Sequence, residues 1–284
     1  VMISIKSILE LLRTILKNGG IENYEFESIC ILEDVFKSEV YDMISNKLEC
    51  EDSDERINQC KAMAQRRIDG FPLQYILGKW EFYGLPFKVG EGVLIPRQDT
   101  ETLVDYVITM FKEYPNLKIV DLCSGTGCIP ISIEKHLNDP EVHAVELSTI
   151  AFDYLKDNVS INGSKVVPHL ADVLESSTAE QFSGFDLITA NPPYLNRTDM
   201  ENLQKEVSYE PKTSLFGGDD GLNYYRTICQ LWKGSLKVGG MMVFEVGIHQ
   251  EKDVSKIMQQ NGFSDIVVIP DLCGVNRVVS GIAP

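Results

Sequence analysis

From about residue 98 onward, short apolar runs alternate with longer amphipathic stretches, and this alternation constrains the fold more than any other feature. The apolar runs predict strands at 118–123, 142–147, 166–170, 185–190, 241–246, 265–270 and 276–282. The amphipathic stretches predict helices at 99–112, 127–137, 149–161, 221–237 and 248–261. Strands joined by helical crossovers form a mostly parallel sheet with helices on both faces. The last two strands are too close in sequence for a crossover, so we expect that pair to be antiparallel.

The first part of the chain has a different periodicity. Apolar residues recur there at spacings of three and four, which is typical of one face of an amphipathic helix: Ile5, Ile8, Leu9, Leu12, Ile15 and Leu16. Further helices are expected at about 25–37 and 38–48, and from Ser53, a good N-cap, to Gly70, a good C-terminal stop. The acidic cluster from Glu49 to Glu55 is either a binding face or, as such clusters more often are, a solvated loop ahead of a helix.

The segment between these two regions, from about Trp80 to Arg97, is aromatic and β-branched with glycine breaks, which predicts a short hairpin. A chain of 284 residues suits a small domain followed by one of ordinary size. We therefore expect an all-helical domain at 1–78, a β-hairpin linker at 79–97 and an α/β domain at 98–284. The helical domain has no catalytic spacing of its own and is typical of a partner-recognition module.

The composition excludes several classes of function. The net charge of −16 argues against a protein that mainly grips a phosphate backbone. Seven scattered cysteines form no CxxC pair, and the four histidines are isolated, so we expect a reducing compartment and no metal site. No apolar run reaches the roughly 20 residues of a membrane span. Lys6, Glu10 and Arg13 interrupt the pattern of a signal peptide. We expect a cytoplasmic monomer that contacts neither membrane nor nucleic acid directly.

A glycine turn follows the first strand of the α/β region, in the run from Ile119 to Gly127. Ligands of open α/β sheets bind at the carboxyl ends of strands, where glycine lets the backbone approach closely. The turn lacks the third glycine of a dinucleotide fingerprint and the lysine of a P-loop, and Asp121 would repel a polyphosphate. An acidic turn instead suits a ligand with an ammonium and a sulfonium, which is S-adenosyl-L-methionine. The turn residues expected at this cofactor are Asp121, Cys123, Ser124, Gly125, Thr126 and Gly127.

Acidic residues also end the next two predicted strands. Glu146 stands 25 positions after Asp121, where a carboxylate can accept hydrogen bonds from both ribose hydroxyls. Asp172 is placed to meet the adenine amino group, with Val173 against the ring. Each position has a simpler interpretation: Glu146 as a surface glutamate and Asp172 as a helix N-cap. Cys123 and Cys128 flank the glycines and are interpreted as packed residues rather than a redox pair.

The fourth predicted strand ends in the tetrapeptide Asn191-Pro192-Pro193-Tyr194. Both prolines have φ fixed near −65° and lack an N–H, so the segment is stiff. A planar NH2 group can donate one hydrogen bond to the Asn191 side-chain oxygen and another to the Pro192 carbonyl, with Tyr194 as a flat wall. An ordinary loop after a strand is the simpler interpretation of the prolines alone. Four strand ends meeting at one crevice favour the binding function.

At this point the chain resembles the bacterial peptide-chain release factor N5-glutamine methyltransferases, which are class I S-adenosylmethionine-dependent methyltransferases. The resemblance covers nearly the whole chain. Its most particular segment is Leu94-Ile-Pro-Arg-Gln-Asp-Thr-Glu101, which follows the helical region. The segments that also carry it are 72–78, 82–85, 121–127, 191–194, 209–211, 217–222, 244–247 and 277–279. Two departures are minor: Glu146 stands where the family more often has Asp, and the glycine turn contains a cysteine and a serine.

The resemblance implies a Rossmann-like domain that methylates the glutamine of the Gly-Gly-Gln tripeptide of release factors. Carried over by position, Cys123 to Gly127, Glu146 and Val173 line the cofactor. Asn191 to Tyr194 hold the glutamine, with Asn191, Pro192 and Tyr194 as catalytic residues. It also implies that the N-terminal helices help to recognise the release factor. The resemblance is weakest in those helices.

Two other functions remain open from the sequence. An N6-adenine or other nucleic-acid amino-methyltransferase presents a similar NH2 group to the same tetrapeptide, but it needs basic and aromatic surfaces that this acidic chain lacks. A non-catalytic cofactor-binding accessory protein of the translation machinery fits less well, because the Asn191 tetrapeptide is intact.

Overall fold

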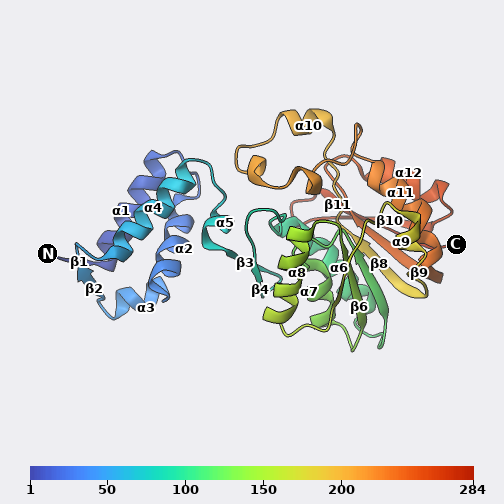
Figure 1. The fold of residues 1–284 in the computed structure, drawn as a ribbon, viewed down its shortest axis with the longest axis horizontal. Helices are drawn as coiled ribbons and strands as arrows, with labels where there is room; N and C mark the ends of the chain where they lie inside the picture. Colours follow the sequence, from blue (N-terminus) through green and yellow to red (C-terminus); the bar gives the residue numbers. More distant parts are fainter. The chain divides into compact units, whose positions relative to one another are not determined.

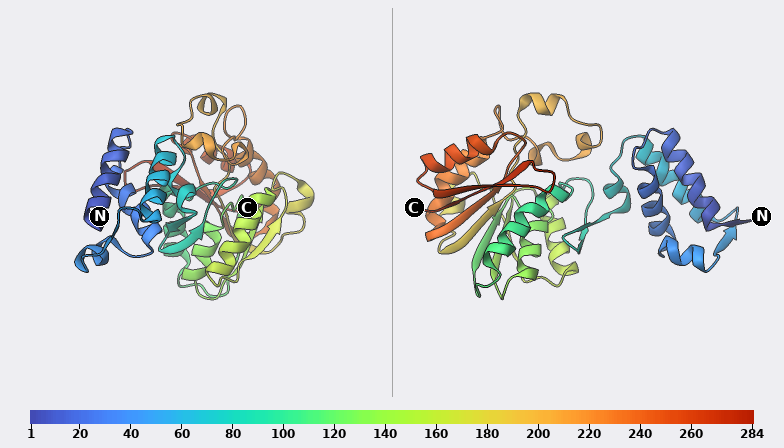
Figure 2. Two further views of the ribbon diagram at one scale, coloured as in Figure 1. Left: turned by 60° about the vertical axis from the view of Figure 1, so that its left-hand side comes forward. Right: turned by 180° about the vertical axis from the view of Figure 1, so that it is seen from behind.

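The computed structural model describes all residues from Val1 to Pro284. The chain forms two compact units, drawn in Figures 1 and 2. One unit contains residues 1–78 together with the short segment 204–209, and the other contains residues 79–203 and 210–284. None of the helices is long and apolar enough to span a membrane.

The first unit is built around three helices that pack on one another: α1 (Ile5–Asn18), α2 (Tyr24–Phe36) and α4 (Glu55–Ile68). The shorter helices α3 (Val40–Ser45) and α5 (Leu73–Leu77) complete it. The apolar face predicted for the first helix is inside this bundle, where Ile5, Ile8, Leu9, Leu12 and Leu16 are buried. The Ser4 side chain caps α1 by accepting a hydrogen bond from the backbone of Ser7.

The first unit is not purely helical, which corrects the sequence prediction. Strand β1 (Met2–Ser4) pairs antiparallel with β2 (Glu49–Glu51), a contact between residues far apart in sequence. The acidic cluster therefore contains a strand as well as a helix start. The N-cap of α4 is Asp54 rather than Ser53, because the Asp54 carboxylate accepts the backbone N–H of Arg56 at 2.9 Å. Gly70 follows the end of α4 with φ +94°, as a C-terminal stop requires.

The buried Arg67 side chain links the segment 204–209 to the helices of the first unit. The guanidinium of Arg67 donates to the carboxylate of Glu27 at 2.6 Å and to that of Glu206 at 2.7 Å. Arg67 and Glu27 are both 7% exposed. Burial raises the pKa of Glu27, and the hydrogen bonds from Arg67 oppose that rise. Removing Arg67 or Glu27 would leave the other charge buried and uncompensated, and removing Arg67 would also remove the ion pair to Glu206.

The second unit begins with the expected hairpin, in which β3 (Lys79–Phe82) pairs antiparallel with β4 (Leu85–Lys88). Its two turn residues, Tyr83 and Gly84, have φ +51° and φ +72°. Positive φ at both central positions gives the turn whose twist matches that of the two strands. A short 3₁₀ turn, η1 (Gln98–Thr100), then leads into helix α6 (Glu101–Phe111).

The sheet of the second unit has seven strands in the order β10-β11-β9-β8-β5-β6-β7. β5 pairs parallel with both β6 and β8, β7 adds to β6, and β9 adds to β8. β11 is antiparallel to both β9 and β10, so the predicted antiparallel end of the sheet is confirmed. The strands are β5 (Lys118–Leu122), β6 (Glu141–Glu146), β7 (Val167–Leu170), β8 (Phe185–Ala190), β9 (Leu236–Glu245), β10 (Ser264–Pro270) and β11 (Asn276–Ile282).

Helices cover both faces of this sheet, as Figure 1 and the rear view in Figure 2 show. Helices α6, α7 (Cys128–His136) and α8 (Thr149–Ile161) pack on one face. Helices α9 (Ser176–Ala179), α11 (Asn223–Trp232) and α12 (Glu251–Gln260) pack on the other. The short helix α10 (Arg197–Glu201) follows β8, and further 3₁₀ turns occur at 207–209, 212–214 and 233–235. A three-layer α/β fold results.

The largest boundary error in the prediction concerns β9, which begins at Leu236 rather than at residue 241. Gly239 has φ +76°, and the pairing of β8 with β9 shifts register between Phe185 and Leu187. The glycines of this irregular start hid the strand in the sequence. The same misassignment made the predicted helix at 221–237 too long. In the structure this helix, α11, ends at Trp232.

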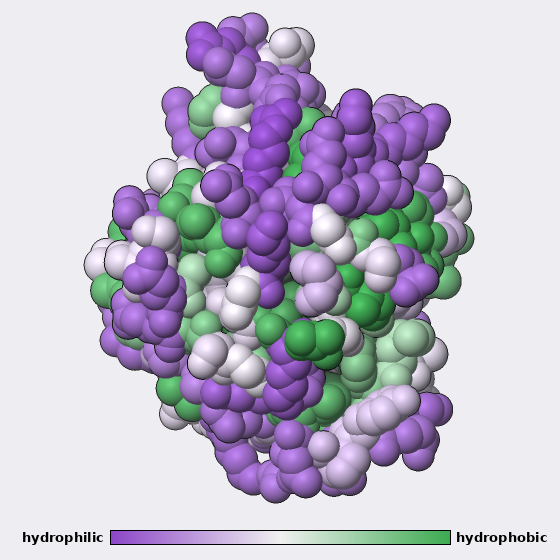
Figure 3. Space-filling model, turned by 90° about the vertical axis from the view of Figure 1, so that its right-hand side faces the viewer, coloured by the Kyte–Doolittle hydropathy of each residue, from purple (hydrophilic) through white to green (hydrophobic).

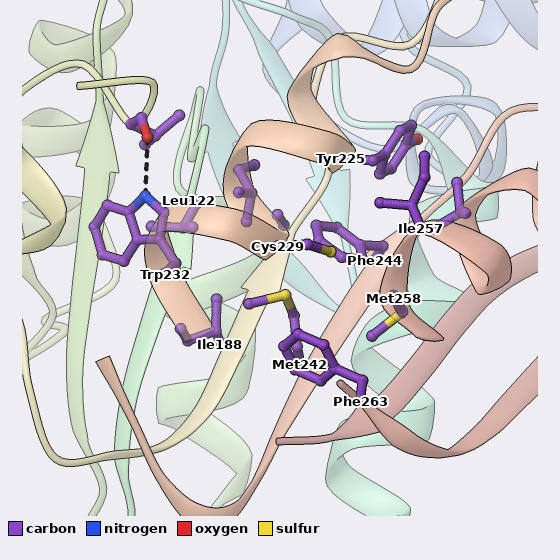
Figure 4. Packing of buried hydrophobic residues seen from close by; sticks show 14 of the residues in the cluster. Leu122, Ile188, Tyr225, Cys229, Trp232, Met242, Phe244, Ile257, Met258 and Phe263 are labelled. Carbon is purple, nitrogen blue, oxygen red and sulfur yellow. Dashed lines mark hydrogen bonds between the residues drawn. The ribbon is translucent and has the colours of Figure 1, made fainter. Parts of the chain in front are cut away.

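Strands in the middle of the sheet send alternate residues into two apolar clusters. Ile188 and Met242 lie in the cluster under α11 and α12, whereas Leu187 and Met241 lie in the cluster under α6 and α7. Figure 4 shows the first cluster, in which the indole N–H of Trp232 donates to the backbone carbonyl of Val173 at 2.9 Å. On the face in Figure 3, hydrophilic residues predominate in the upper part and along the lower edge, and apolar residues form patches between them.

We expect Trp232→Phe to lower the free energy of unfolding by about 1–3 kcal/mol, because the Val173 carbonyl loses its donor in the dry core. Trp232 is completely buried. Denaturant unfolding measures the change, and Trp80→Phe on the half-buried strand β3 is the control. Equal losses in the two variants would contradict a specific role for the Trp232–Val173 hydrogen bond.

Candidate functional site

A cavity of about 380 Å³ opens at the carboxyl ends of the central parallel strands. Its walls come from the glycine turn after β5, from the ends of β6 and β8, and from two covering segments at 92–97 and 211–214. This is the edge at which open α/β sheets bind ligands. The volume is within the usual range for a small-molecule site.

The glycine turn has the backbone that its residues predict. Cys123, Gly125 and Gly127 have φ +60°, +54° and +82°. A Cβ atom on Gly127 would lie 2.4 Å from the side chain of Leu155, so this glycine permits close packing of the turn against α8. A Cβ atom on Gly125 would meet no atom within 4 Å, so Gly125 leaves open space. Cys123, Ser124, Gly125 and Thr126 line the cavity, whereas Gly127 does not.

Asp121 lies beneath the turn and is completely buried. One carboxylate oxygen accepts a hydrogen bond from Thr189 Oγ1 at 2.6 Å, whereas Oδ2 is buried without a partner. Burial raises the pKa of Asp121 to about 7, although the hydrogen bond from Thr189 opposes the rise. Asp121 supports the turn from below and does not line the cavity itself.

Glu146 ends β6 and lines the cavity with its carboxylate nearly buried. Its two oxygens accept the backbone N–H groups of Gly125 and Ser148, each at 2.8 Å. Burial raises the pKa of Glu146, and these backbone hydrogen bonds oppose the rise. A carboxylate has about four acceptor positions, so Glu146 keeps acceptor capacity for further hydroxyl donors. The residue is therefore not a surface glutamate.

Asp172 and Val173 also line the cavity. The Asp172 carboxylate accepts the backbone N–H of Leu174 at 2.9 Å, which is a local turn rather than a helix N-cap. The following helix begins at Ser176, with Glu175 at the cap position. Tyr224 from α11 contributes a wall that the sequence did not predict, and burial raises its pKa to about 12.

Only part of the Asn191–Tyr194 tetrapeptide reaches this cavity. Asn191 and Pro193 line it, whereas Pro192 and Tyr194 do not. Tyr194 packs against the apolar cluster beneath α11, and burial raises the pKa of its phenol. The Tyr194 backbone carbonyl accepts a hydrogen bond from Gln250 Nε2 at 2.9 Å.

The glycines at 217 and 221 explain how the tetrapeptide is held. A Cβ atom on Gly217 would lie 2.5 Å from the Pro193 carbonyl oxygen, and one on Gly221 would lie 2.3 Å from that of Tyr194. Both positions therefore exclude any side chain. The segment 217–222 braces the tetrapeptide from behind.

Sequence reasoning assigned no role to several polar residues around Asn191. Arg97, on the cavity wall, forms an ion pair with the buried carboxylate of Glu210. The other oxygen of Glu210 accepts the Ile95 backbone N–H at 3.0 Å, so Glu210 joins the two covering segments. Thr100 and Glu245 lie next to Asn191, each 2% exposed. For Glu245, the sequence did contain a signal that could have identified it: an acidic residue that directly follows an apolar run, in Phe244-Glu245.

We expect Asp121→Asn to raise the melting temperature of the ligand-free protein above about pH 7 and to leave it nearly unchanged near pH 4. The folded-state pKa of Asp121, about 7, exceeds the unfolded value. The folded state therefore binds more protons between these two pKa values, and the wild type loses stability as pH rises through that window. Each pKa unit corresponds to about 1.4 kcal/mol.

Melting curves followed by circular dichroism across this pH range measure the effect. Asp219→Asn, whose side chain is 79% exposed, is the control and should leave the pH dependence as it is. A lower melting temperature of Asp121→Asn at high pH would contradict the account of a costly buried carboxylate.

The site can be compared with known proteins. The family model of the methyltransferase small domain matches residues 99–215, and that of the PrmC N-terminal domain matches residues 7–78. The release factor glutamine methyltransferase of Fusobacterium nucleatum is 37% identical over 268 residues, which cover 93% of this chain and 75% of that protein. The protein of that name from Clostridium acetobutylicum is 35% identical over 278 residues, which cover 97% of each chain.

Solved structures share the fold at low identity. A methyltransferase from Pyrococcus furiosus matches with a TM-score of 0.52 at 16% identity, covering 71% of this chain and 90% of that one. A 16S rRNA methyltransferase from Thermus thermophilus, in complex with AdoMet and guanosine, matches with a TM-score of 0.53 at 13% identity, covering 72% of this chain and 50% of that one. The fold is therefore that of Rossmann-like methyltransferases, and the identities to the curated relatives go further: the chain belongs to the release factor glutamine methyltransferase family.

Proposed function

We propose that this protein transfers a methyl group from S-adenosyl-L-methionine to the side-chain amide nitrogen of the glutamine in the Gly-Gly-Gln motif of peptide-chain release factors. The observation that carries the proposal is the meeting of Asn191 with the glycine turn and Glu146 in one cavity. An acceptor of a planar NH2 group and a candidate nucleoside site thereby share one enclosed space. Family membership supplies the identity of the acceptor.

The residues present fit the cofactor. The unpartnered, buried Oδ2 of Asp121 and the nearly buried carboxylate of Glu146 make this end of the cavity negative, which favours a cationic ligand. The open space above Gly125 leaves room for close approach of the ligand to the backbone. Glu146 retains acceptors for ribose hydroxyls, and Val173 with Tyr224 gives a partly apolar wall for the base. Asp172 is the candidate acceptor for the adenine amino group.

The bound cofactor supplies an activated methyl group, so the chain's own residues mainly have to orient the acceptor. A glutamine amide nitrogen is a weak nucleophile because its lone pair is delocalised, as in the peptide bond. The Asn191 Oδ1 atom accepts one hydrogen of the substrate NH2 group. The Pro192 carbonyl is the candidate acceptor for the other, although Pro192 itself does not line the cavity. Holding the nitrogen in line with the methyl group in this way lowers the activation barrier by roughly 7–11 kcal/mol.

These two acceptors also stabilise the positive charge that develops on the nitrogen, as preorganised dipoles do in other enzymes. Pro193 contributes stiffness and part of the wall. Tyr194 is anchored in the core, so its contribution is to hold the tetrapeptide in place. The surplus proton leaves to water after transfer.

The helical unit, residues 1–78, is proposed to recognise the body of the release factor. It matches the PrmC N-terminal domain, and none of the cavity walls comes from it. Its large exposed apolar side chains include Phe26 and Tyr41, which are 55% and 78% exposed. Such side chains are the kind that anchor protein interfaces. We further propose a cytoplasmic monomer that acts on release factors without contacting nucleic acid directly.

We expect Asn191→Ala to lower kcat for release factor methylation by about 10²–10³-fold, because one preorganised polar contact to the reacting group is lost. Cofactor affinity should stay close to that of the wild type. Quantified transfer of labelled methyl groups and calorimetric cofactor titration measure the two properties. Asn202→Ala, an exposed asparagine outside the cavity, is the matched control. Near wild-type turnover of Asn191→Ala would sink the role of this residue.

A chain that begins at Lys79 tests the recognition role of the helical unit. We expect its KM for an intact release factor to rise by at least roughly tenfold, about 1.4 kcal/mol of lost binding. Its KM for a short Gly-Gly-Gln peptide should change little, because the cavity is built from the second unit alone. Retained cofactor binding checks that the shortened chain is folded. An equal rise for both substrates would remove the recognition role.

A further inference from the structure

Two polar residues stand side by side at the ends of neighbouring strands. In the parallel pairing of β8 with β9, Ala190 is opposite Phe244. The next residue on each strand is Asn191 and Glu245, respectively. Because both follow the same register pair, their backbones are adjacent at the edge of the cavity. Asn191 lines the cavity, whereas Glu245 is covered and 2% exposed.

Thr100 connects these two side chains. It comes from the end of η1, is 2% exposed and lines the cavity. Asn191 Nδ2 donates to Thr100 Oγ1 at 3.4 Å. The Thr100 hydroxyl also lowers the pKa of the neighbouring Glu245 carboxylate, against the rise that burial causes, which is the effect of a hydroxyl that donates towards a carboxylate. The Asn191 contact is long, as catalytic hydrogen bonds often are before the substrate binds.

The direction of these hydrogen bonds follows from the number of protons available. A hydroxyl has a single hydrogen, and an ionised carboxylate can only accept. When Thr100 donates to Glu245, its oxygen can only accept from Asn191. The NH2 end of the Asn191 amide must then face Thr100, and Oδ1 is left for the substrate. An amide turned by 180° would offer the substrate NH2 group another donor.

We propose that Thr100 and Glu245 are positioning residues that fix the Asn191 amide with its oxygen towards the acceptor NH2 group. This inference rests on the proposed glutamine methylation and deepens it. Neither residue touches the reacting atoms. Each acts through the orientation of Asn191.

Burying the Glu245 carboxylate is unfavourable for folding, which supports a functional role for this residue. Its Oε2 atom is buried without a hydrogen-bond partner, which is unfavourable for folding. The nearby cation Arg277 directs its ion pairs to Asp99 at 2.8 Å and Asp271 at 3.1 Å instead. An apolar residue of similar size would avoid this cost. Buried groups of this kind are concentrated at functional sites.

The arrangement also predicts a pH dependence. Burial raises the pKa of Glu245 to about 7. Above that value the carboxylate accepts from Thr100, as the orientation of Asn191 requires. Below it, the carboxylic acid can donate to Thr100, which frees the Thr100 hydrogen to pair with Asn191 Oδ1. The titratable groups around Glu245, from each element packed against it, are Arg97, Asp99, Cys128, Tyr194, Tyr225 and Arg277.

Three variants of the full chain test the proposal with release factor as the acceptor. Thr100→Val keeps the shape and removes the hydroxyl, so we expect kcat to fall roughly 10²-fold, as misorientation of a catalytic group does. Thr100→Ser keeps the hydroxyl and should retain at least about a third of the wild-type kcat. Both should keep the wild-type KM for the cofactor. In Glu245→Gln, the rise of kcat with pH through about 7 should disappear.

The outcomes separate the inference from the proposed function. Wild-type kcat in Thr100→Val, or equal losses in Thr100→Val and Thr100→Ser, would overturn the positioning role. An unchanged pH profile in Glu245→Gln would do so as well. If the wild type itself methylates no release factor, the proposed function fails. The positioning role is then decided by NMR of the Asn191 side-chain amide, whose signals should be sharp in wild type and Thr100→Ser and exchange-broadened in Thr100→Val. Sharp signals in all three would overturn it.

Discussion

The parallel pairing of β5 with its neighbours β6 and β8 is the constraint on which the site depends. Ile119, Val120, Asp121 and Leu122 are in register with residues 187–190 of β8, and the same strand is in register with β6. Parallel register brings the three carboxyl ends to one edge, so the glycine turn, Glu146 and Asn191 meet although they are far apart in sequence. The Thr189–Asp121 hydrogen bond of 2.6 Å links two of these strands directly beneath the turn.

Three carboxylates are buried near that edge of the sheet, and burying their charge lowers the stability of the ligand-free protein. Asp121, Glu146 and Glu245 all have raised pKa values because burial disfavours their charged forms. Two of them keep a buried oxygen without a partner. A cationic ligand relieves part of that cost at the first two positions, which favours binding of a sulfonium compound over a neutral one. Glu245 stands apart from them, because its partner Thr100 leads to Asn191.

Much of this architecture could be predicted because the strongest signals are local. The strand at 185–190 and the helix at 149–161 match their predicted bounds, since a continuous apolar run and a regular amphipathic face leave little choice. The β1–β2 pair was missed because three-residue strands pair across nearly fifty residues of chain. The start of β9 was missed because its glycines resemble a turn. Such features depend on tertiary partners, which a local pattern does not contain.

The site residues that could be predicted from the sequence are those that stand directly at the end of a predicted strand. Glu146 and Asn191 were found in this way, and both line the cavity. Thr100, Glu210 and Tyr224 come from other segments, and no spacing connects them to the strand ends. Tyr194 shows the opposite case. Its motif predicts a flat wall for the substrate, but its ring packs against the apolar cluster beneath α11.

The identity of the methyl acceptor is the central claim. A competition assay tests it most directly: methyl-labelled S-adenosylmethionine is offered to the protein together with release factor, tRNA, rRNA and DNA, and the modified residue is located by mass spectrometry. The account predicts label on the glutamine of the Gly-Gly-Gln motif alone. Label on a nucleic-acid amino group with none on the release factor would contradict it.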